Sequence, residues 1–320
     1  MKYREYDFLR NMRLFLSGRF ALAFTILLIG VLTARLLTPE NRGLYALFFT
    51  TCGLIVTLFH VGISPANVYF LNEKKREIGE LFGNSLLFCI FSFLTLMVMF
   101  LFFVGIDYQG PFNNIDKWAT WSMVLLVVLA TLVETSISGL AYASNLYAFV
   151  SRALIIQSIL LFTSVLAIKA FGDELVYVLF YRVVAVIVFI IYFVFEFKRI
   201  INIVEIKFSF PILKEQIVFG SKNWSQNIIG FLNVRSYILI LGFTSSPKIV
   251  GFFSVAWLFI EVIRFLPETV GTMLLPSLTK TTSEIEKKLL TIKALKLILY
   301  FTICIALLLF FTFELSIPLI

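Results

Sequence analysis

The sequence predicts an all-α fold, a polytopic transmembrane helical bundle of about nine helices. Hydrophobic residues make up 60% of its 320 residues, Phe alone occurs 37 times, and the mean hydropathy is +0.97. A soluble domain this apolar could not keep its surface hydrated. In a bilayer, by contrast, helices satisfy their own backbone hydrogen bonds. The bilayer is therefore the predicted solvent of this chain.

Long apolar runs place the helices in order along the chain. Each run is long enough to cross a hydrocarbon core of roughly 30 Å at 1.5 Å per residue. The first run lacks a convincing small-residue cleavage site, so we interpret it as a retained helix rather than a signal peptide. Within the second run, Gly62 and Pro65 favour a broken or bent helix. The predicted ranges are 14–37, 44–71, 80–105, 118–145, 150–171, 175–196, 216–243, 249–275 and 293–317.

Lys and Arg residues are unevenly divided between the two sides of the predicted bundle. The N-terminal side holds Lys2, Arg4, Arg10, Arg13, Lys74, Lys75, Arg76, Arg152, Lys198, Arg199, Lys207, Lys214, Lys280, Lys287, Lys288 and Lys293. The opposite side holds Arg42, Lys117, Lys169 and Lys248. Because basic loops tend to stay in the cytoplasm, the N-terminus is predicted to be cytoplasmic. Membrane orientation thus explains the net charge of +8, and no nucleic-acid partner is expected.

A polar segment, residues 197–215, divides the chain into an N-terminal six-helix lobe, 1–196, and a C-terminal lobe, 216–320. Its aliphatic and basic residues suit an amphipathic cytoplasmic linker lying on the leaflet, with a plain solvated loop as the alternative. Residues 36–45 and 242–253 share a turn that has Pro and one basic residue before a helix start. Such repeats indicate a two-lobed transporter. The second lobe has three predicted helices and is expected to be incomplete, as in a fragment or a shortened reading frame.

Charged residues interrupt several apolar runs, and charge is costly in hydrocarbon unless it faces a polar path. In the run 249–275, Glu261, Arg264 and Glu268 are spaced i, i+3 and i+7 and therefore share one helix face. This stripe predicts the wall of a water-filled cavity. A self-neutralising Glu261–Arg264 pair that tolerates burial is the alternative.

The run 216–243 is also too polar to face lipid throughout. Lys222, Gln226 and Asn233 fall near one of its faces, and Arg235 follows two residues after Asn233. We expect this helix to contribute polar groups to the same cavity.

Four other helices contribute one candidate each. Arg19 and Arg182 could line a cavity or snorkel to an interface. Glu134 lies near mid-helix, where it could pair with a basic residue or accept a proton. Asn67 follows the predicted break in the second helix, whose freed backbone groups could face a cavity, although a structural kink is the alternative. The complete set of substrate-cavity candidates is Arg19, Asn67, Glu134, Arg182, Lys222, Gln226, Asn233, Arg235, Glu261 and Arg264.

Basic residues outnumber acidic ones inside the predicted membrane segments. The bases are Arg19, Arg182, Lys222, Arg235 and Arg264, and the acids are Glu134, Glu261 and Glu268. A net cationic cavity would attract an anionic substrate such as a pyrophosphate or an acidic sugar. The sequence has no nucleotide-binding loop, metal-ligand cluster or catalytic constellation. We therefore expect no enzyme, metal or cofactor, and transport coupled to a proton or sodium gradient.

Three stretches carry a resemblance to a known family. The first is 34–47, ARLLTPENRGLYAL, and the others are 62–71 and 250–276. The first resembles the end of the first helix in bacterial polysaccharide flippases, where the pattern is roughly A-R-x-L-G-P-E-x-x-G-x-Y; here Thr38 replaces the usual Gly. The other two are similar to that family's second-helix ending and eighth helix. These O-antigen and exopolysaccharide flippases belong to the MATE-like multidrug/oligosaccharidyl-lipid/polysaccharide exporter superfamily.

The resemblance implies a MATE-like fold of two lobes around a central, often cationic, cavity with alternating access. It implies flipping of undecaprenyl-pyrophosphate-linked oligosaccharide repeat units across the bacterial inner membrane, for O-antigen, capsule or exopolysaccharide synthesis. The expected partners are that lipid-linked substrate, membrane lipids and other glycan-assembly membrane proteins.

Three alternatives remain open at this point. A MATE-type drug/cation antiporter would need an acid-dominated cavity. A glycan polymerase or transferase would need a large outer loop, and the longest one predicted here is 106–117. A non-transporting, truncated membrane protein would act only as an assembly partner.

Overall fold

The computed structural model describes residues 2–105, 117–171, 175–201, 206–281 and 283–316. Within these residues it consists of helices and connecting turns, without strands. Eight of the described helices are long and apolar enough to cross a membrane. The predicted all-α polytopic bundle is therefore confirmed, and the chain is a multi-pass membrane protein.

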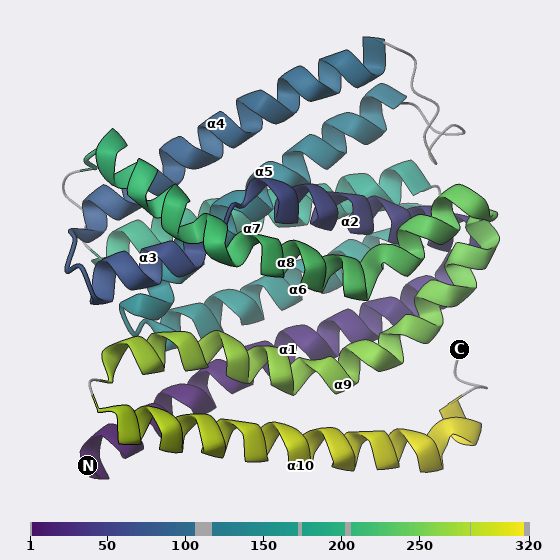
Figure 1. Ribbon diagram of the computed structural model, residues 1–320. Helices are drawn as coiled ribbons and strands as arrows, with labels where there is room; N and C mark the ends of the chain where they lie inside the picture. The colour runs from purple at the N-terminus through teal and green to yellow at the C-terminus, as the bar shows by residue number, and fades with distance from the viewer. Residues whose placement is uncertain (1, 106–116, 172–174, 202–205, 282, 317–320) are drawn as a thin grey trace.

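The helices run back and forth along one bundle axis, with the N-terminus at one end and the C-terminus at the other (Figure 1). Their bounds are α1 Lys2–Leu36, α2 Pro39–Phe59, α3 Ile63–Asn72, α4 Ile78–Gly105, α5 Lys117–Ala143, α6 Tyr147–Phe171, α7 Leu175–Ile201, α8 Phe210–Thr244, α9 Pro247–Lys280 and α10 Glu284–Ser316. The longest predicted outer loop, 106–117, lies almost wholly outside the described residues.

Large apolar side chains cover the outside of the bundle. Phe20, Phe102 and Phe195, from three different helices, are 63%, 64% and 72% exposed. On a soluble protein such a surface would be an aggregation liability, whereas in a bilayer these rings face lipid.

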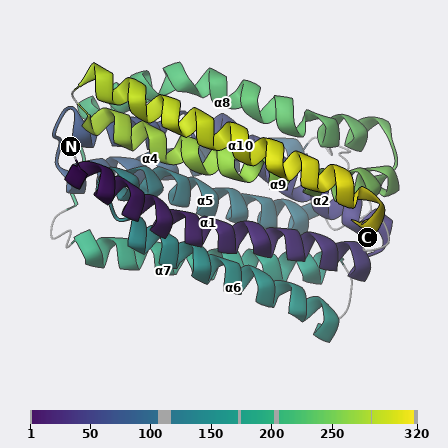
Figure 2. The same ribbon diagram turned by 90° about the horizontal axis from the view of Figure 1, so that it is seen from below.

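Two groups of helices lie on either side of α1. Seen from below, α8, α9 and α10 lie on one side and α6 and α7 on the other (Figure 2). α2 to α7 pack against one another and form the larger group of helices. In its core, rings join α4, α6 and α7: Phe82 stacks on Phe197 at 5.7 Å, and Phe149 lies 5.1 Å from Phe193. These aromatic contacts hold the starts of α4 and α6 against the end of α7.

The structure divides the predicted helix 44–71 into α2 and α3. Val61 and Gly62 have φ angles of 44° and 69°, which a regular helix cannot contain. Gly62 is the N-cap of α3, so the predicted break is confirmed. The carbonyls of Thr57 and Leu58 do not lose their partners, because each accepts a hydrogen bond from Trp224 Nε1 of α8 at 3.1 Å.

Helix ends differ from the predicted ranges mainly because the helices continue into the loops. α7 extends to Ile201 and α8 begins at Phe210, so both overlap the predicted linker 197–215. Pro211 in the first turn explains the early start of α8, because its fixed φ suits the beginning of a helix. Residues 202–205 of the linker lie outside the described residues, and the division into lobes stays a prediction.

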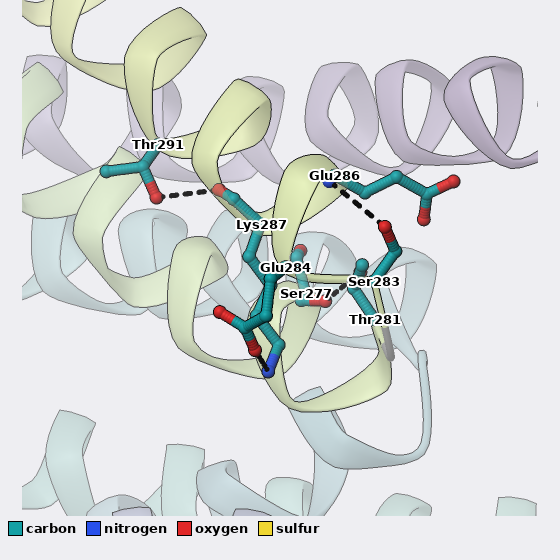
Figure 3. Close-up of polar contacts among 7 residues, drawn as sticks. All are labelled: Ser277, Thr281, Ser283, Glu284, Glu286, Lys287 and Thr291. Carbon is teal, nitrogen blue, oxygen red and sulfur yellow. Dashed lines mark hydrogen bonds and ion pairs between the residues drawn. The ribbon is translucent and has the colours of Figure 1, made fainter.

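α10 begins at Glu284, nine residues before its predicted start at 293. The turn between α9 and α10 explains this start (Figure 3). Ser283 Oγ accepts a hydrogen bond from the backbone N–H of Glu286 at 3.5 Å, in the manner of a helix N-cap. Thr281 Oγ1 donates to the carbonyl of Ser277 at 2.9 Å and closes the end of α9.

α8 and α9 touch the larger helix group at both ends of the bundle. In the α3–α8 contact, the backbones of Gly62 and Gly220 lie against each other, and Tyr69 stacks on Phe219 at 4.3 Å. In the α2–α9 contact, Gly43 lies against the Pro247 carbonyl. Small residues allow helix backbones to approach closely in membranes. The two contacts join the groups near opposite ends of the bundle.

Candidate functional site

A cavity of about 660 Å³ lies between these two contacts. Most of its wall comes from α1, α2, α8 and α9, with further residues from α7 and α10. Its volume is within the range of binding sites for small molecules and headgroups.

Arginine dominates the charged part of the cavity wall. The lining arginines are Arg19, Arg42, Arg182, Arg235 and Arg264, and the lining acids are Glu261 and Glu268. By residue charge the wall is net cationic. A cavity of this kind in low-dielectric surroundings concentrates anions.

The structure brings five of the ten predicted candidates into this wall: Arg19, Arg182, Arg235, Glu261 and Arg264. The other five, Asn67, Glu134, Lys222, Gln226 and Asn233, lie outside it. Lys222, Gln226 and Asn233 are exposed on α8. At about 100° per residue, Arg235 lies roughly 220° around α8 from Lys222, so the two face different surroundings.

Two ion pairs lie in the cavity wall, one between two helices and one within a single helix. Arg235 of α8 pairs with Glu261 of α9, and Arg264 pairs with Glu268 one turn along α9 at 2.6 Å. This arrangement differs from the alternative considered from sequence, in which Glu261 neutralises Arg264. Pairing lowers the cost of placing these charges at membrane depth. The Arg235–Glu261 pair also joins α8 to α9 beside the cavity.

Arg19 lines the cavity, and it interacts with Glu134, which is not among the lining residues. The guanidinium carbon of Arg19 is 5.5 Å from the ring centre of Phe15, and Arg19 and Glu134 attract each other electrostatically. Gln157 Nε2 donates to Glu134 Oε2 at 3.5 Å. Glu134 thus has a basic neighbour and an amide donor, of which the sequence predicted the first.

Asn67 is fully buried in a polar network of the α3–α8 contact, away from the cavity. Its Nδ2 donates to Ser85 Oγ and to the Ser136 carbonyl, each at 2.8 Å. Its Oδ1 accepts from Gln216 Nε2 of α8 at 2.7 Å. Gln216 Oε1 in turn accepts from Asn84 Nδ2 at 3.1 Å. The network joins α3, α4, α5 and α8.

Arg42 is a cavity residue that the sequence analysis assigned to a loop. It lies in the first turn of α2, is only 7% exposed, and its guanidinium carbon lies 5.4 Å from the ring centre of Tyr45. The signal for this placement was present. Thr38 caps the helix by accepting from the Asn41 N–H at 3.3 Å, and Pro39 occupies its first turn. These two residues are a helix-start signal, and a predicted start at 39 instead of 44 would have placed Arg42 inside the second helix.

Arg182 of α7 also stacks on a cavity ring. Its guanidinium carbon lies 5.5 Å from the ring centre of Phe49, and its Nη1 donates to the Leu161 carbonyl at 3.4 Å. Tyr45 and Phe49 lie 4.8 Å apart between ring centres, so the two arginines and two rings form a continuous row.

The fold and the cavity define a multi-pass membrane protein with a cationic space between two groups of helices. A model of the polysaccharide biosynthesis protein family matches residues 8–282, and the chain belongs to this family. The resemblance found in the sequence is thereby confirmed. Neither curated proteins nor solved structures gave a significant match to this chain.

Proposed function

We propose that this protein flips undecaprenyl-pyrophosphate-linked oligosaccharide repeat units from the cytoplasmic to the outer face of a bacterial inner membrane. The product would feed O-antigen, capsule or exopolysaccharide synthesis. Family membership supports a transport role in polysaccharide biosynthesis. The observation that carries the proposal is the cavity wall of five arginines against two glutamates.

The charge of the wall favours an anionic substrate over an organic cation. A pyrophosphate offers several acceptor oxygens, and guanidinium groups bind such oxygens through paired N–H donors. A drug/cation antiporter would need the opposite balance of charge around its cavity. The lining acids are moreover both paired with arginines, Glu261 with Arg235 and Glu268 with Arg264.

Alternating access would use the two contacts at the ends of the cavity. Opening the α3–α8 contact would admit substrate from one side of the membrane, and opening the α2–α9 contact would release it on the other. The excess of basic residues near the N-terminal side supports a cytoplasmic N-terminus. In this proposal a proton or sodium gradient drives the cycle without a cofactor, and other glycan-assembly membrane proteins supply and receive the substrate.

The test is the sidedness of lipid-linked oligosaccharide in spheroplasts of a flippase-deficient strain that expresses the chain. Glycan accessible at the outer face supports flipping. Arg235→Ala and Arg264→Ala should each reduce outer glycan about tenfold or more at equal membrane levels, because each removes a cation from the wall. Lys214→Ala, which removes an exposed cation of α8, is the matched control. Normal outer glycan in both arginine variants would contradict the cavity's role.

A further inference from the structure

We propose that Arg42 and Arg182 form an anion-binding position at the end of the cavity where α1 ends and α2 begins. Its ligand is a carboxylate or phosphate group carried by the molecule that is moved. This inference rests on the proposed function for the identity of that molecule. Arg19, by contrast, lies about 17 residues before the end of α1, or about 25 Å along the helix axis. The cavity would thus hold anions at two depths.

Stacking holds the two guanidinium groups by their planar faces, and a hydrogen bond from Arg182 Nη1 to the Leu161 carbonyl holds the second one further. Arg42 lies over Tyr45 and Arg182 over Phe49, and all four residues line the cavity. A stacked guanidinium uses its planar face, so its N–H groups can still point to an anion. Two such groups on adjoining rings make a preorganised pair.

Arg42 also holds a buried donor without a partner. Its Nε is inaccessible and makes no hydrogen bond within the described part of the chain. Buried polar groups in folded proteins are nearly always paired, and an arginine that is 7% exposed is unusual. A charge buried this deeply in a cavity wall is costly, and an anion in the cavity would offset that cost.

The electrostatic surroundings leave Arg42 undercompensated. It lies in the first turn of α2, where the helix dipole disfavours a cation. Glu261 attracts it, but the same carboxylate already pairs with Arg235. With Arg182 nearby in the row, three cations share one lining acid at this end of the cavity. An anion bound there would offset the excess charge.

The first experiment measures anion binding by the purified full-length protein, independently of transport. Trp257 lines the cavity, so Trp fluorescence can follow titration with inorganic pyrophosphate and with glucuronate. Arg42→Gln should weaken binding of at least one anion about tenfold or more, and Arg42→Lys should retain part of it. Lys248→Gln removes an exposed cation from the same end of the bundle and should bind as the unmodified protein does.

Thermal unfolding distinguishes this role from a purely structural one. Without anion, Arg42→Gln should be at least as stable as the unmodified protein, because an undercompensated buried charge is removed. Pyrophosphate or glucuronate should raise the Tm of the unmodified protein and of Lys248→Gln, but not of Arg42→Gln. Unchanged anion affinity in Arg42→Gln, or no binding of either anion by the unmodified protein, would overturn the proposal.

Flipping assays in proteoliposomes then identify the source of the anion. The substrates are undecaprenyl-pyrophosphate-linked oligosaccharides that differ only in whether one sugar is neutral or a uronic acid. If Arg42→Gln loses only the acidic substrate, the ligand is the sugar carboxylate; loss of both identifies the pyrophosphate. Normal flipping of both would overturn the proposal. Arg42-dependent anion binding without any flipping would support the binding position and count against the proposed function.

Discussion

The two contacts at the ends of the cavity differ in their chemistry. In the α3–α8 contact, the buried amides of Asn67, Asn84 and Gln216 form a hydrogen-bonded chain beside the close approach of Gly62 and Gly220. In the α2–α9 contact, glycines meet the carbonyls at the start of the opposite helix: Gly43 meets Pro247 and Gly251 meets Pro39. Both contacts bring glycine backbones close to the opposite helix, and the α3–α8 contact adds specific polar pairs.

This difference predicts how each end can separate. Helices packed through glycine can shift without exchanging hydrogen bonds, since dispersion contacts are lost gradually. The amide chain cannot, because each separated amide must find water or another partner. We therefore expect the α3–α8 end to open in one discrete step that lets water in, and the α2–α9 end to move in smaller steps.

The largest effect is expected from a steric wedge at either end. A Cβ at Gly220 would lie 2.7 Å from the Gly62 carbonyl oxygen, and one at Gly43 would meet the backbone of Pro247. Backbone atoms cannot move aside as side chains do, so Gly220→Val and Gly43→Val should hold opposite ends apart. We expect each variant to lower flipping tenfold or more. Gly230→Val is the control, because nothing lies within 4 Å of a Cβ there.

Cysteine labelling shows whether the two wedges act at different ends. The three native cysteines are replaced by alanine, and a reporter cysteine is placed at Thr50 in the cavity wall. A membrane-impermeant thiol reagent should label Gly220→Val faster from one side of the membrane and Gly43→Val faster from the other. Labelling of both from the same side would contradict the assignment of the two contacts to opposite ends.

A smaller effect is expected from breaking the amide chain without a wedge. Gln216→Leu removes the amide that donates to Asn67 Oδ1 and accepts from Asn84 Nδ2. Asn67 and Asn84, which are both fully buried, each lose one hydrogen-bond partner. The free energy of unfolding should fall by about 1–2 kcal/mol, measured by denaturant or thermal unfolding in one detergent. Gln226→Leu makes the same change at an exposed site of α8 and should leave the stability near that of the unmodified protein. Equal stability of the two variants would mean that the amide chain contributes little.

Sequence patterns predicted the helices well, and local signals explain where they failed. Apolar runs gave the fold class, and Gly62 gave the break between α2 and α3. The cap signals at Thr38 and Ser283 were present but outweighed by hydropathy, so α2 and α10 were predicted to start late.

The rotation of each helix could not be predicted in the same way. Which face of α8 meets the cavity depends on its packing through Gly220 and Trp224 against the break between α2 and α3. The hydrogen bond between Asn67 and Gln216 spans 149 residues of sequence. Helical periodicity within one segment holds no information on such partners, so it grouped Lys222 with the cavity while Arg42 was missed.

The smallest effect is expected at an exposed ion pair that joins the residue just before α4 to the segment just before α8. Lys207 Nζ and Glu77 Oε2 lie 3.0 Å apart, but the two side chains are 53% and 69% exposed. Water and salt screen such a pair, and ordering two long side chains costs entropy. Glu77→Gln should therefore change the free energy of unfolding by less than about 0.5 kcal/mol. A loss as large as that in Gln216→Leu, measured in the same detergent, would mean that this exposed pair stabilises the fold as much as the buried amides do.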